Sequence, residues 1–307
     1  MMAQPATAQP ATPATIDPQT VVADDPVLAA RPENRVWKKF RSHKSAMLGG
    51  ILVGFFVLMA VFAPLLPIPD PTATDWGAVR KAPSAAHWLG TDEIGRDVLS
   101  RLVWGARASL MAGVVSVGIA VAFGVPLGIL AGYFGGWTDG IISRCTEALL
   151  AVPFLILAIA LAAFLGPSLT NAMIAIGLSA TPVFVRLTRG QVISVKAEDY
   201  VEGAHAIGLS TPKILRRYVF PNILPPVLVQ ATLTIATAII AEASLSFLGL
   251  GQQPPAPSWG SMLNTAKNFL AQAPWMAMWP GIAIFLVVLG FNLLGDGLRD
   301  ALDPREH

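Results

Sequence analysis

The chain has little charge and almost no cysteine. Asp, Glu, Lys and Arg make up 13% of its 307 residues, whereas ordinary soluble domains carry about 25%. Because apolar residues reach 54%, the composition excludes a disordered protein and argues against a soluble globular enzyme. The formal net charge of +2 is too small to indicate nucleic-acid binding. With Cys145 as the only cysteine, no internal disulfide or cysteine-based zinc site can form, and its apolar surroundings predict a buried, unreactive thiol.

What the sequence does have is a series of long runs without Asp, Glu, Lys or Arg. A helix needs about 20 apolar residues to cross a bilayer. The runs cover 46–69, 108–138, 148–185, 218–241 and 268–295. The third run is too long for one span, and Gly166, Pro167 and Ser168 interrupt it near its middle. The chain is therefore predicted to be an all-α membrane protein with six transmembrane helices.

An even number of spans places both termini on the same side of the membrane, and the basic residues indicate which side. Six spans put these residues on the side of the termini: Arg31, Arg35, Lys38, Lys39, Arg41, Lys44, Arg186, Arg189, Lys196, Lys213, Arg216, Arg217, Arg299 and Arg305. The opposite side receives only Arg80, Lys81, Arg96, Arg101, Arg107 and Lys267. Because cytoplasmic loops carry the excess of Lys and Arg, both termini are predicted to be cytoplasmic.

The chain divides into four parts. Residues 1–34 are rich in Ala, Pro and Thr and predict a disordered cytoplasmic tail. Residues 35–66 contain the first transmembrane helix, and 67–107 form an external segment. Residues 108–307 form the remaining spans, with a cytoplasmic loop at 190–221.

The external segment ends in a stretch of mixed charge. Asp92 and Asp97 stand close in sequence to Arg96, and Val98 and Leu102 make an apolar stripe. This pattern predicts a short helix at the membrane surface before the second span. Asp92, Arg96 and Asp97 belong either to a solvated external cap or to a contact with a delivery partner outside the membrane.

The second long external segment, 249–277, is predicted to turn back without a helix at its start. Glycine and proline are too dense over 248–260 for a helix to form there. Trp259, Trp275 and Trp279 suit an aromatic belt at the membrane interface.

The cytoplasmic segment between spans four and five predicts a helix, a tight turn and a second helix outside the bilayer. Tyr200, Val201, Ala204 and Ile207 recur at helical spacing. Gly208 fits the position that ends a helix. Thr211 and Pro212 fit the N-cap and first position of the next helix.

The first of these helices has a face of small residues. Gly203, Ala204 and Ala206 leave room for another protein to pack closely. The helix is therefore either a docking element or an ordinary interfacial helix.

Glu242 lies near the end of the fifth span among apolar residues. An acid inside a membrane is a functional candidate by default. The nearby interface favours a hydrogen-bonded or solvated structural acid, and the alternative is a pathway residue that meets the amino group of a substrate. Arg144 and Glu147 are spaced i, i+3 and predict a surface ion pair.

The cytoplasmic segment resembles the "EAA" loop of permease subunits from binding-protein-dependent ATP-binding-cassette (ABC) importers. That pattern is Glu-Ala-Ala, three residues, Gly, and a Pro 13 residues after the Gly. Glu202, Ala204, Gly208 and Pro221 match it, and Gly203 replaces the first Ala. Gly in place of Ala loosens a helix by roughly 1 kcal/mol.

Three further stretches resemble the peptide/nickel branch of this family, in particular its second, C-type permease. They are 90–97, 245–251 and 295–304, and the likeness runs from about residue 35 to the end. It implies a type I importer architecture, with one N-terminal helix before a five-helix core, in the inner membrane of a bacterium.

The resemblance also implies partners and a mechanism. The permease pairs with a second homologous permease, and the pathway lies between them within the membrane lipid. Two ATPase subunits, which bind ATP and Mg, dock through Glu202, Gly203, Ala204, Gly208 and Pro221. An extracytoplasmic binding protein delivers a di- or oligopeptide, with glutathione and chelated nickel left open. The chain itself is expected to hold no cofactor, metal or catalytic residue and no nucleic acid, and it has no Gly-Lys dipeptide of a phosphate-binding loop.

A secondary transporter is the distant alternative. Such a protein needs a self-contained pathway, usually built from internal repeats with broken helices at the midplane. The sequence shows no repeat, and ionisable residues are nearly absent from the middle of the spans.

Overall fold

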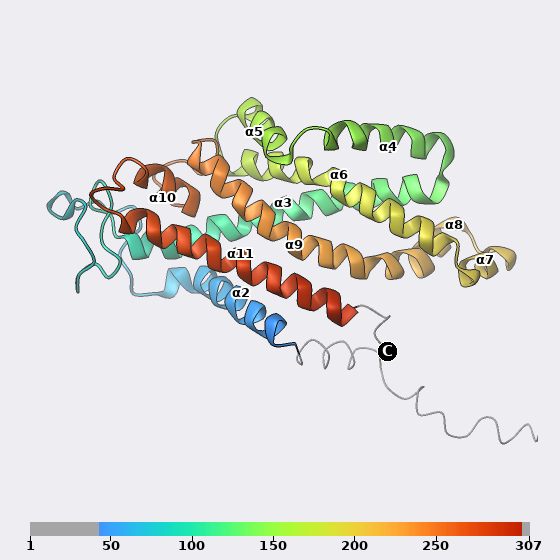
Figure 1. Cartoon of the computed structure of the whole chain (residues 1–307), viewed down its shortest axis with the longest axis horizontal. Helices are drawn as coiled ribbons and strands as arrows, with labels where there is room; N and C mark the ends of the chain where they lie inside the picture. The colour runs from blue at the N-terminus through green and yellow to red at the C-terminus, as the bar shows by residue number, and fades with distance from the viewer. Residues whose placement is uncertain (1–42, 303–307) are drawn as a thin grey trace, which may run out of the picture.

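The computed structural model describes residues 43–302. The predicted tail 1–34, the first part of the 35–66 unit, Arg305 and the end of the 295–304 motif lie outside these residues. Over the described part the chain is helical, and its one β-bridge joins Thr91 to Asp97. The helices are α2 (Lys44–Phe62), α3 (Val98–Phe134), α4 (Gly136–Leu150), α5 (Phe154–Leu165), α6 (Leu169–Lys196), α7 (Asp199–Ala206), α8 (Thr211–Ile214), α9 (Phe220–Phe247), α10 (Trp259–Ala266) and α11 (Trp275–Leu302) (Figure 1).

Five stretches are long and apolar enough to cross a membrane: 44–65, 98–134, 169–196, 211–247 and 275–302. The sixth crossing is a broken one, because α4 and α5 meet at an angle of 91°. Pro153 stands at the break, directly before α5, and a residue that precedes proline is disfavoured in helical conformation. The third span was expected to begin near residue 148, but α4 begins at Gly136 and carries three charged residues along an exposed helix.

The direction of α3 and α6 shows that the bent pair crosses once. Gly124 of α3 faces Phe184 of α6, and Gly132 faces Val192 eight residues further along both helices. The two helices are therefore parallel, and the chain must return to its starting side between them. Only α4 and α5 lie between them in the sequence, so the six-span, all-α prediction is confirmed.

Glycines allow α3 and α6 to pack closely. Gly124, Gly128 and Gly132 fall on one face of α3 at intervals of four residues. A Cβ atom on Gly128 would lie 2.6 Å from the Cβ of Thr188 on α6. Small residues in such a row let the backbones of membrane helices approach each other.

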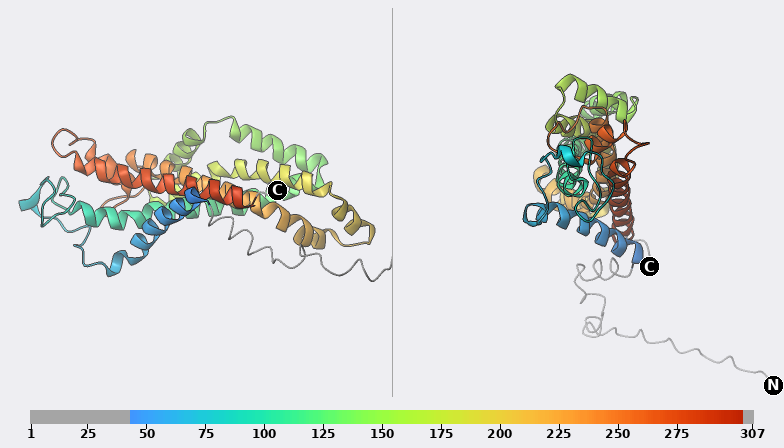
Figure 2. Two further views of the ribbon diagram at one scale, coloured as in Figure 1. Left: turned by 60° about the horizontal axis from the view of Figure 1, so that its bottom comes forward. Right: turned by 90° about the vertical axis from the view of Figure 1, so that its left-hand side faces the viewer.

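The N-terminal helix lies on the flank of the bundle. α2 runs antiparallel to α11, since Gly49 meets Leu294 and Gly297 meets Ala46. Figures 1 and 2 show these two helices side by side along one edge. α9 passes between α3 and α11. It is antiparallel to α3, because Glu242 contacts Ser109 whereas the earlier residue Ile239 contacts the later residue Gly113.

The external end differs from the prediction in two elements. The prediction of a separate surface helix before the second span is wrong. Residues 88–97 form a loop, and α3 runs without a break from Val98. Asp97 caps α3 by accepting a hydrogen bond from the backbone N–H of Ser100 at 2.8 Å. A short helix, α10, forms where the chain was expected only to turn, and Ser258 and Ser261 cap it reciprocally.

Two residues predicted from local composition lie in other surroundings. Trp259 is fully buried instead of joining an interfacial belt. Its Nε1 donates to the carbonyl of Leu102 at 3.0 Å, and its ring packs edge-on against Phe56. Cys145 is exposed instead of buried, because α4 leaves most of its surface uncovered.

Candidate functional site

The predicted docking loop lies at one extreme end of the molecule. Figure 1 shows α7 and α8 beyond the ends of the other helices, opposite α10. Val201 and Ala204 are 0% and 3% exposed and pack in the core together with Ile214 and Val219. The loop is therefore anchored by its own apolar side, and its other side is free for a partner.

The docking residues divide between these two sides. Glu202 and Gly203 are exposed, and a Cβ on Gly203 would meet no atom within 4 Å. Ala204 faces inward, so its predicted place on a contact face for another protein is wrong. Tyr200 and Ile207 add exposed apolar surface, with Ile207 76% exposed. A surface that combines an exposed acid with exposed apolar side chains is suited to contact another protein.

Gly208 ends α7 as predicted. Its φ of +77° lies in the left-handed region, which glycine adopts without the cost that a Cβ brings. The backbone N–H of Leu209 donates to the carbonyl of Ala204 at 3.1 Å, which closes the helix end. The next helix begins one residue early, since Ser210 is the N-cap and Thr211 is the first helical residue.

A π-helix, Leu215–Val219, joins α8 to α9. Pro221 then falls in the first turn of α9 and is exposed. The helical backbone continues from the π-helix through Pro221, because residues 211–247 form one stretch that is apolar enough to cross a membrane. The motif residue Pro221 thus lies on the helix that joins the predicted docking loop to this span.

A cluster not predicted from the sequence ties α7 to the core. His205 Nε2 lies 3.1 Å from the hydroxyl of Tyr133, at the end of α3. Lys196 Nζ donates to the carbonyl of Tyr133 at 2.8 Å and lies 5.3 Å from the centre of its ring. Since Tyr133 is only 6% exposed, these contacts join α7 to the buried ends of α3 and α6.

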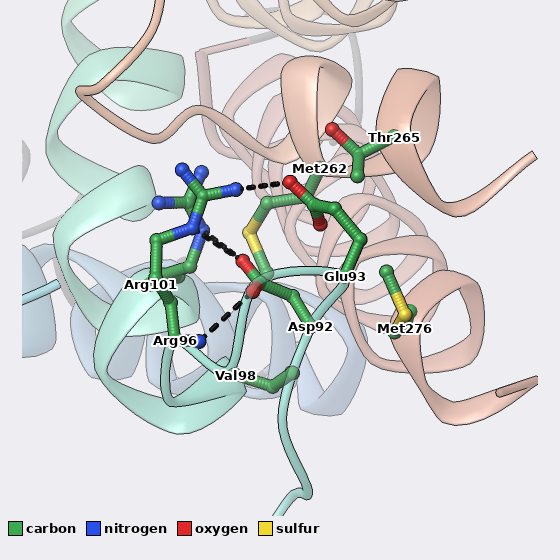
Figure 3. Close-up of a pocket in the computed structure, with 8 residues that line it drawn as sticks. All are labelled: Asp92, Glu93, Arg96, Val98, Arg101, Met262, Thr265 and Met276. Carbon is green, nitrogen blue, oxygen red and sulfur yellow. Dashed lines mark hydrogen bonds and ion pairs between the residues drawn. The ribbon is translucent and has the colours of Figure 1, made fainter. Parts of the chain in front are cut away.

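At the opposite end, four charged side chains form what we term the external ion cluster: Asp92, Glu93, Arg96 and Arg101 (Figure 3). Asp92 Oδ2 accepts from Arg96 Nε at 2.6 Å and lies 3.4 Å from Arg101 Nε. Arg96 Nη2 donates to Glu93 Oε1 at 2.5 Å. Arg101 also donates to the carbonyl of Pro71 at 3.0 Å. The cluster joins the external loop to the first turn of α3.

The predicted cap residues are therefore not solvated. Asp92, Arg96 and Asp97 are only 5–6% exposed, and Asp97 Oδ1 lies 3.1 Å from His87 Nδ1. Their charges hold the loop on α3 and are not displayed to a partner. The small cavity beside them has a volume of about 10 Å³, which is room for one water molecule.

Glu93 is the member of the cluster with the least compensated charge. Its Oε2 is buried and has no hydrogen-bond partner within the described part of the chain. Burial, and then the negative charge of Asp92, raise the pKa of the Glu93 carboxyl above its ordinary value, against the lowering effect of Arg96.

Glu242 is a structural acid in this conformation. Its side chain is fully buried and accepts from Ser109 Oγ at 3.0 Å and Ser246 Oγ at 2.6 Å. The pathway alternative for Glu242 is not supported, because the carboxylate reaches no surface of the chain. The predicted Arg144–Glu147 ion pair is confirmed at 3.4 Å on the exposed side of α4.

Residues 43–302 contain no group of three or more His, Cys, Asp or Glu side chains arranged to hold a metal ion. Hydrogen bonds and ion pairs within the chain account for the clusters of polar side chains at both ends. The geometry thus offers one surface for another protein at the docking loop and a rigid cap at the other end.

Two family models of known proteins match this chain, one over its N-terminal part and one over the larger C-terminal part. The family model for the binding-protein-dependent transport system inner membrane component matches residues 124–307. The model for the N-terminal TM domain of oligopeptide transport permease C matches residues 34–83. A dipeptide transport system permease protein of Alkalihalophilus pseudofirmus is 47% identical over 282 residues, covering 92% of this chain and 93% of its own. A glutathione transport system permease protein of Pectobacterium atrosepticum is 43% identical over 275 residues, covering 89% and 91%.

The fold also resembles a solved transporter. An inward-facing methionine ABC transporter structure aligns with a TM-score of 0.54 and 20% identity, covering 67% of this chain and 98% of that one. At this identity the likeness concerns the fold alone. It supports the type I importer arrangement predicted for the core.

Proposed function

This chain belongs to the family of binding-protein-dependent transport system inner membrane components, and from that membership we propose that it is the C-type permease subunit of an ATP-driven importer of di- or oligopeptides. The observation that carries the proposal is the docking loop. It places an exposed Glu202 and an open Gly203 at one end of a six-span bundle. The similarity to a dipeptide permease over 92% of the chain supports the peptide substrate.

In this proposal the chain does no chemistry and works with three kinds of partner. Two ATPase subunits, which bind ATP and Mg, supply the energy, and one of them docks on Glu202, Gly203, Gly208 and the exposed side of α7. A second homologous permease completes the pathway, and an extracytoplasmic binding protein delivers the substrate. Closure of the ATPases on ATP moves α7, and the Tyr133–His205 contact passes that movement to α3.

Glutathione is the second candidate substrate, because a glutathione permease is 43% identical to this chain. Both candidates carry peptide N–H groups, carboxylates and an ammonium group. Uptake of a labelled dipeptide and of labelled glutathione into vesicles that contain the complete transporter separates the two.

The docking proposal is tested by charge reversal on the exposed side of α7. We expect Glu202→Arg to abolish co-purification of the ATPase subunits from native membranes in mild detergent, because the partner's surface complements an acid at this position. The second permease should still co-purify, since Glu202 is exposed and supports no contact within the chain. Glu147→Arg, on the exposed side of α4, is the matched control and should retain both partners.

Two results would contradict the proposal. If the ATPase subunits remain bound to Glu202→Arg as they do to the parent chain, the docking surface is elsewhere. If the parent chain purifies with no ATPase at all, the importer assignment fails and the secondary transporter becomes the leading alternative.

A further inference from the structure

Uncharged polar side chains recur along one face of α9, on which the apolar residues Leu233 and Ile240 also lie. The polar residues are Asn222, Gln230, Thr237 and Ser244, which we term the polar face of α9. Their spacings of about two helical turns place them within roughly 80° of one another around the axis, at 100° per residue. Thr237 and Asn222 are exposed, and Gln230 and Ser244 are half-buried.

Each side chain of the polar face donates one hydrogen bond to a residue of the continuous helical stretch 211–247. Thr237 and Ser244 donate to the carbonyls of Leu233 and Ile240, at 3.4 and 2.8 Å. Asn222 Nδ2 donates to the carbonyl of Tyr218 at 2.6 Å. Gln230 Nε2 donates to Thr234 Oγ1 at 3.1 Å. The side-chain oxygens of the polar face accept no hydrogen bond from the described residues, and the amides of Asn222 and Gln230 each keep a second N–H. The face therefore presents both acceptors and donors.

Two hollows lie along the same face. Near the docking end, Asn222 and Gln230 line a groove of about 710 Å³ together with Gln191 of α6 and Arg299 of α11. Near the external end, Ser244 lines a second hollow of about 420 Å³, against α10 and α11. Figure 1 shows α9 crossing the molecule between α6 and α11, with this stretch uncovered by other helices.

Lipid is an unfavourable neighbour for this face. A polar group that loses water without a partner costs several kcal/mol in hydrocarbon, so exposed polar groups within a span mark a wet cavity or pathway. Elsewhere on α9, Leu224 and Leu228 are similarly exposed but apolar, as lipid or close helix packing requires. The polar face of α9 thus suits a wet environment, whereas the side with Leu224 and Leu228 suits lipid or another helix.

We propose that the polar face of α9 forms one wall of the substrate pathway, where its amide and hydroxyl groups meet the N–H and C=O groups of a passing peptide. This inference rests on the proposed function and names the wall that this chain contributes. Neutral polar groups suit passage, because a pathway must bind its substrate weakly enough to release it. A carboxylate would hold the ammonium group of a peptide more tightly, and the one acid of this span, Glu242, is turned away into the core.

The test is cysteine accessibility in the complete transporter, reconstituted in lipid vesicles. Cys145→Ser removes the only native thiol. In that background, Thr237→Cys and the control Leu228→Cys are treated with a charged, membrane-impermeant methanethiosulfonate. We expect Thr237→Cys to react at least about tenfold faster, because the reactive thiolate is strongly disfavoured in hydrocarbon. A saturating dipeptide should slow its reaction.

The outcomes separate this inference from the proposed function. Equal reactivity at both positions in vesicles that take up dipeptide would overturn the polar wall and leave the importer assignment standing. Absence of dipeptide and glutathione uptake in the parent complex would overturn the proposed function, whatever the labelling shows. Ser244→Cys, on the same face near the external end, replaces Thr237→Cys if that variant does not assemble.

Discussion

The buried carboxylates Asp92, Asp97 and Glu242 are each held by more than one hydrogen-bonding group. Asp92 meets Arg96, Arg101 and two backbone N–H groups. Glu242 has two serine hydroxyls instead of a cation. Removing one partner of a buried charge costs more than the pair contributes, because the remaining charge is left unsolvated. These acids therefore maintain the packing of the external half of the bundle.

Glu93 gives a prediction about pH. Because its pKa is raised in the folded chain, the folded state takes up a proton at a pH where the unfolded chain has already lost it. The contribution of Glu93 to stability is then greatest at low pH and falls as pH rises above the ordinary carboxyl pKa. Glu93→Gln keeps an oxygen for Arg96 and removes this titration. We expect the melting temperature of Glu93→Gln to rise relative to the parent as pH increases from below the ordinary carboxyl pKa of 4.5 to neutral pH.

Thermal unfolding in detergent at several pH values measures this difference. Glu147→Gln, on the exposed side of α4, is the control and should track the parent at every pH. Parallel curves for Glu93→Gln and the parent would show that the pKa of Glu93 is not raised in the folded chain.

At the scale of elements, the close contact between α3 and α6 depends on glycines of α3, which have no side chain. Gly128 and Gly118 both lie on α3, but only Gly128 faces α6. A Cβ on Gly128 would meet Thr188 at 2.6 Å, whereas Gly118 is exposed and has no atom within 4 Å of that position.

We therefore expect Ala substitutions at these two glycines to have opposite effects. Gly128→Ala should destabilise the chain by about 1–3 kcal/mol, because α6 must move to make room. Gly118→Ala should be neutral or stabilising by up to about 1 kcal/mol, because Ala favours a helix more than Gly. Melting temperatures in detergent measure both. A loss of stability of similar size at both positions would show that close packing is not the cause.

At the scale of the whole molecule, the docking loop and the external ion cluster lie at opposite ends of the bundle (Figures 1 and 2). The predicted six-span topology puts the excess of basic residues on the side of the docking loop. Both termini are proposed to be cytoplasmic on this ground. The two ends must then differ in access from outside the cell.

In the Cys145→Ser background, Lys81→Cys in the external loop should react with an impermeant thiol reagent in intact spheroplasts. Lys213→Cys in the docking loop should react only after the membrane is permeabilised. Both lysines are exposed, so access and not burial decides the result. The reverse pattern would invert the topology and separate the docking loop from cytoplasmic ATPases.

Local composition predicted those features that depend only on a short segment of the sequence, such as the spans and the ends of helices. Charge-free runs predicted the spans, and the break at Gly166–Ser168 separates α5 from α6 as expected. Gly208 predicted the end of α7 because only the local backbone demands a left-handed residue there. The EAA resemblance selected Glu202 and Gly203, which are exposed as a docking surface requires.

Local composition could not predict which side of an element faces the core. Trp259 is buried by α2 and α3, which are distant in the sequence, and Ala204 is buried by the packing of α7 on its neighbouring elements. Cys145 is exposed because that side of α4 is uncovered in the described part of the chain. The cap charges were expected to be solvated, yet Asp92 is enclosed by arginines from the loop and from α3. The contact between Tyr133 and His205 joins residues 72 positions apart, so no local spacing indicates it.

The sequence by itself determined that this is a six-span permease with an EAA-like helical loop, because hydrophobic length, glycine ends and the family motif are properties of short segments. Only the tertiary structure decided that Glu242 is sealed in the core and that the polar residues of α9 share one open face. The physical reason is that burial and access depend on which helices become neighbours. That choice is made by packing across the whole bundle, such as the glycine contacts between α3 and α6.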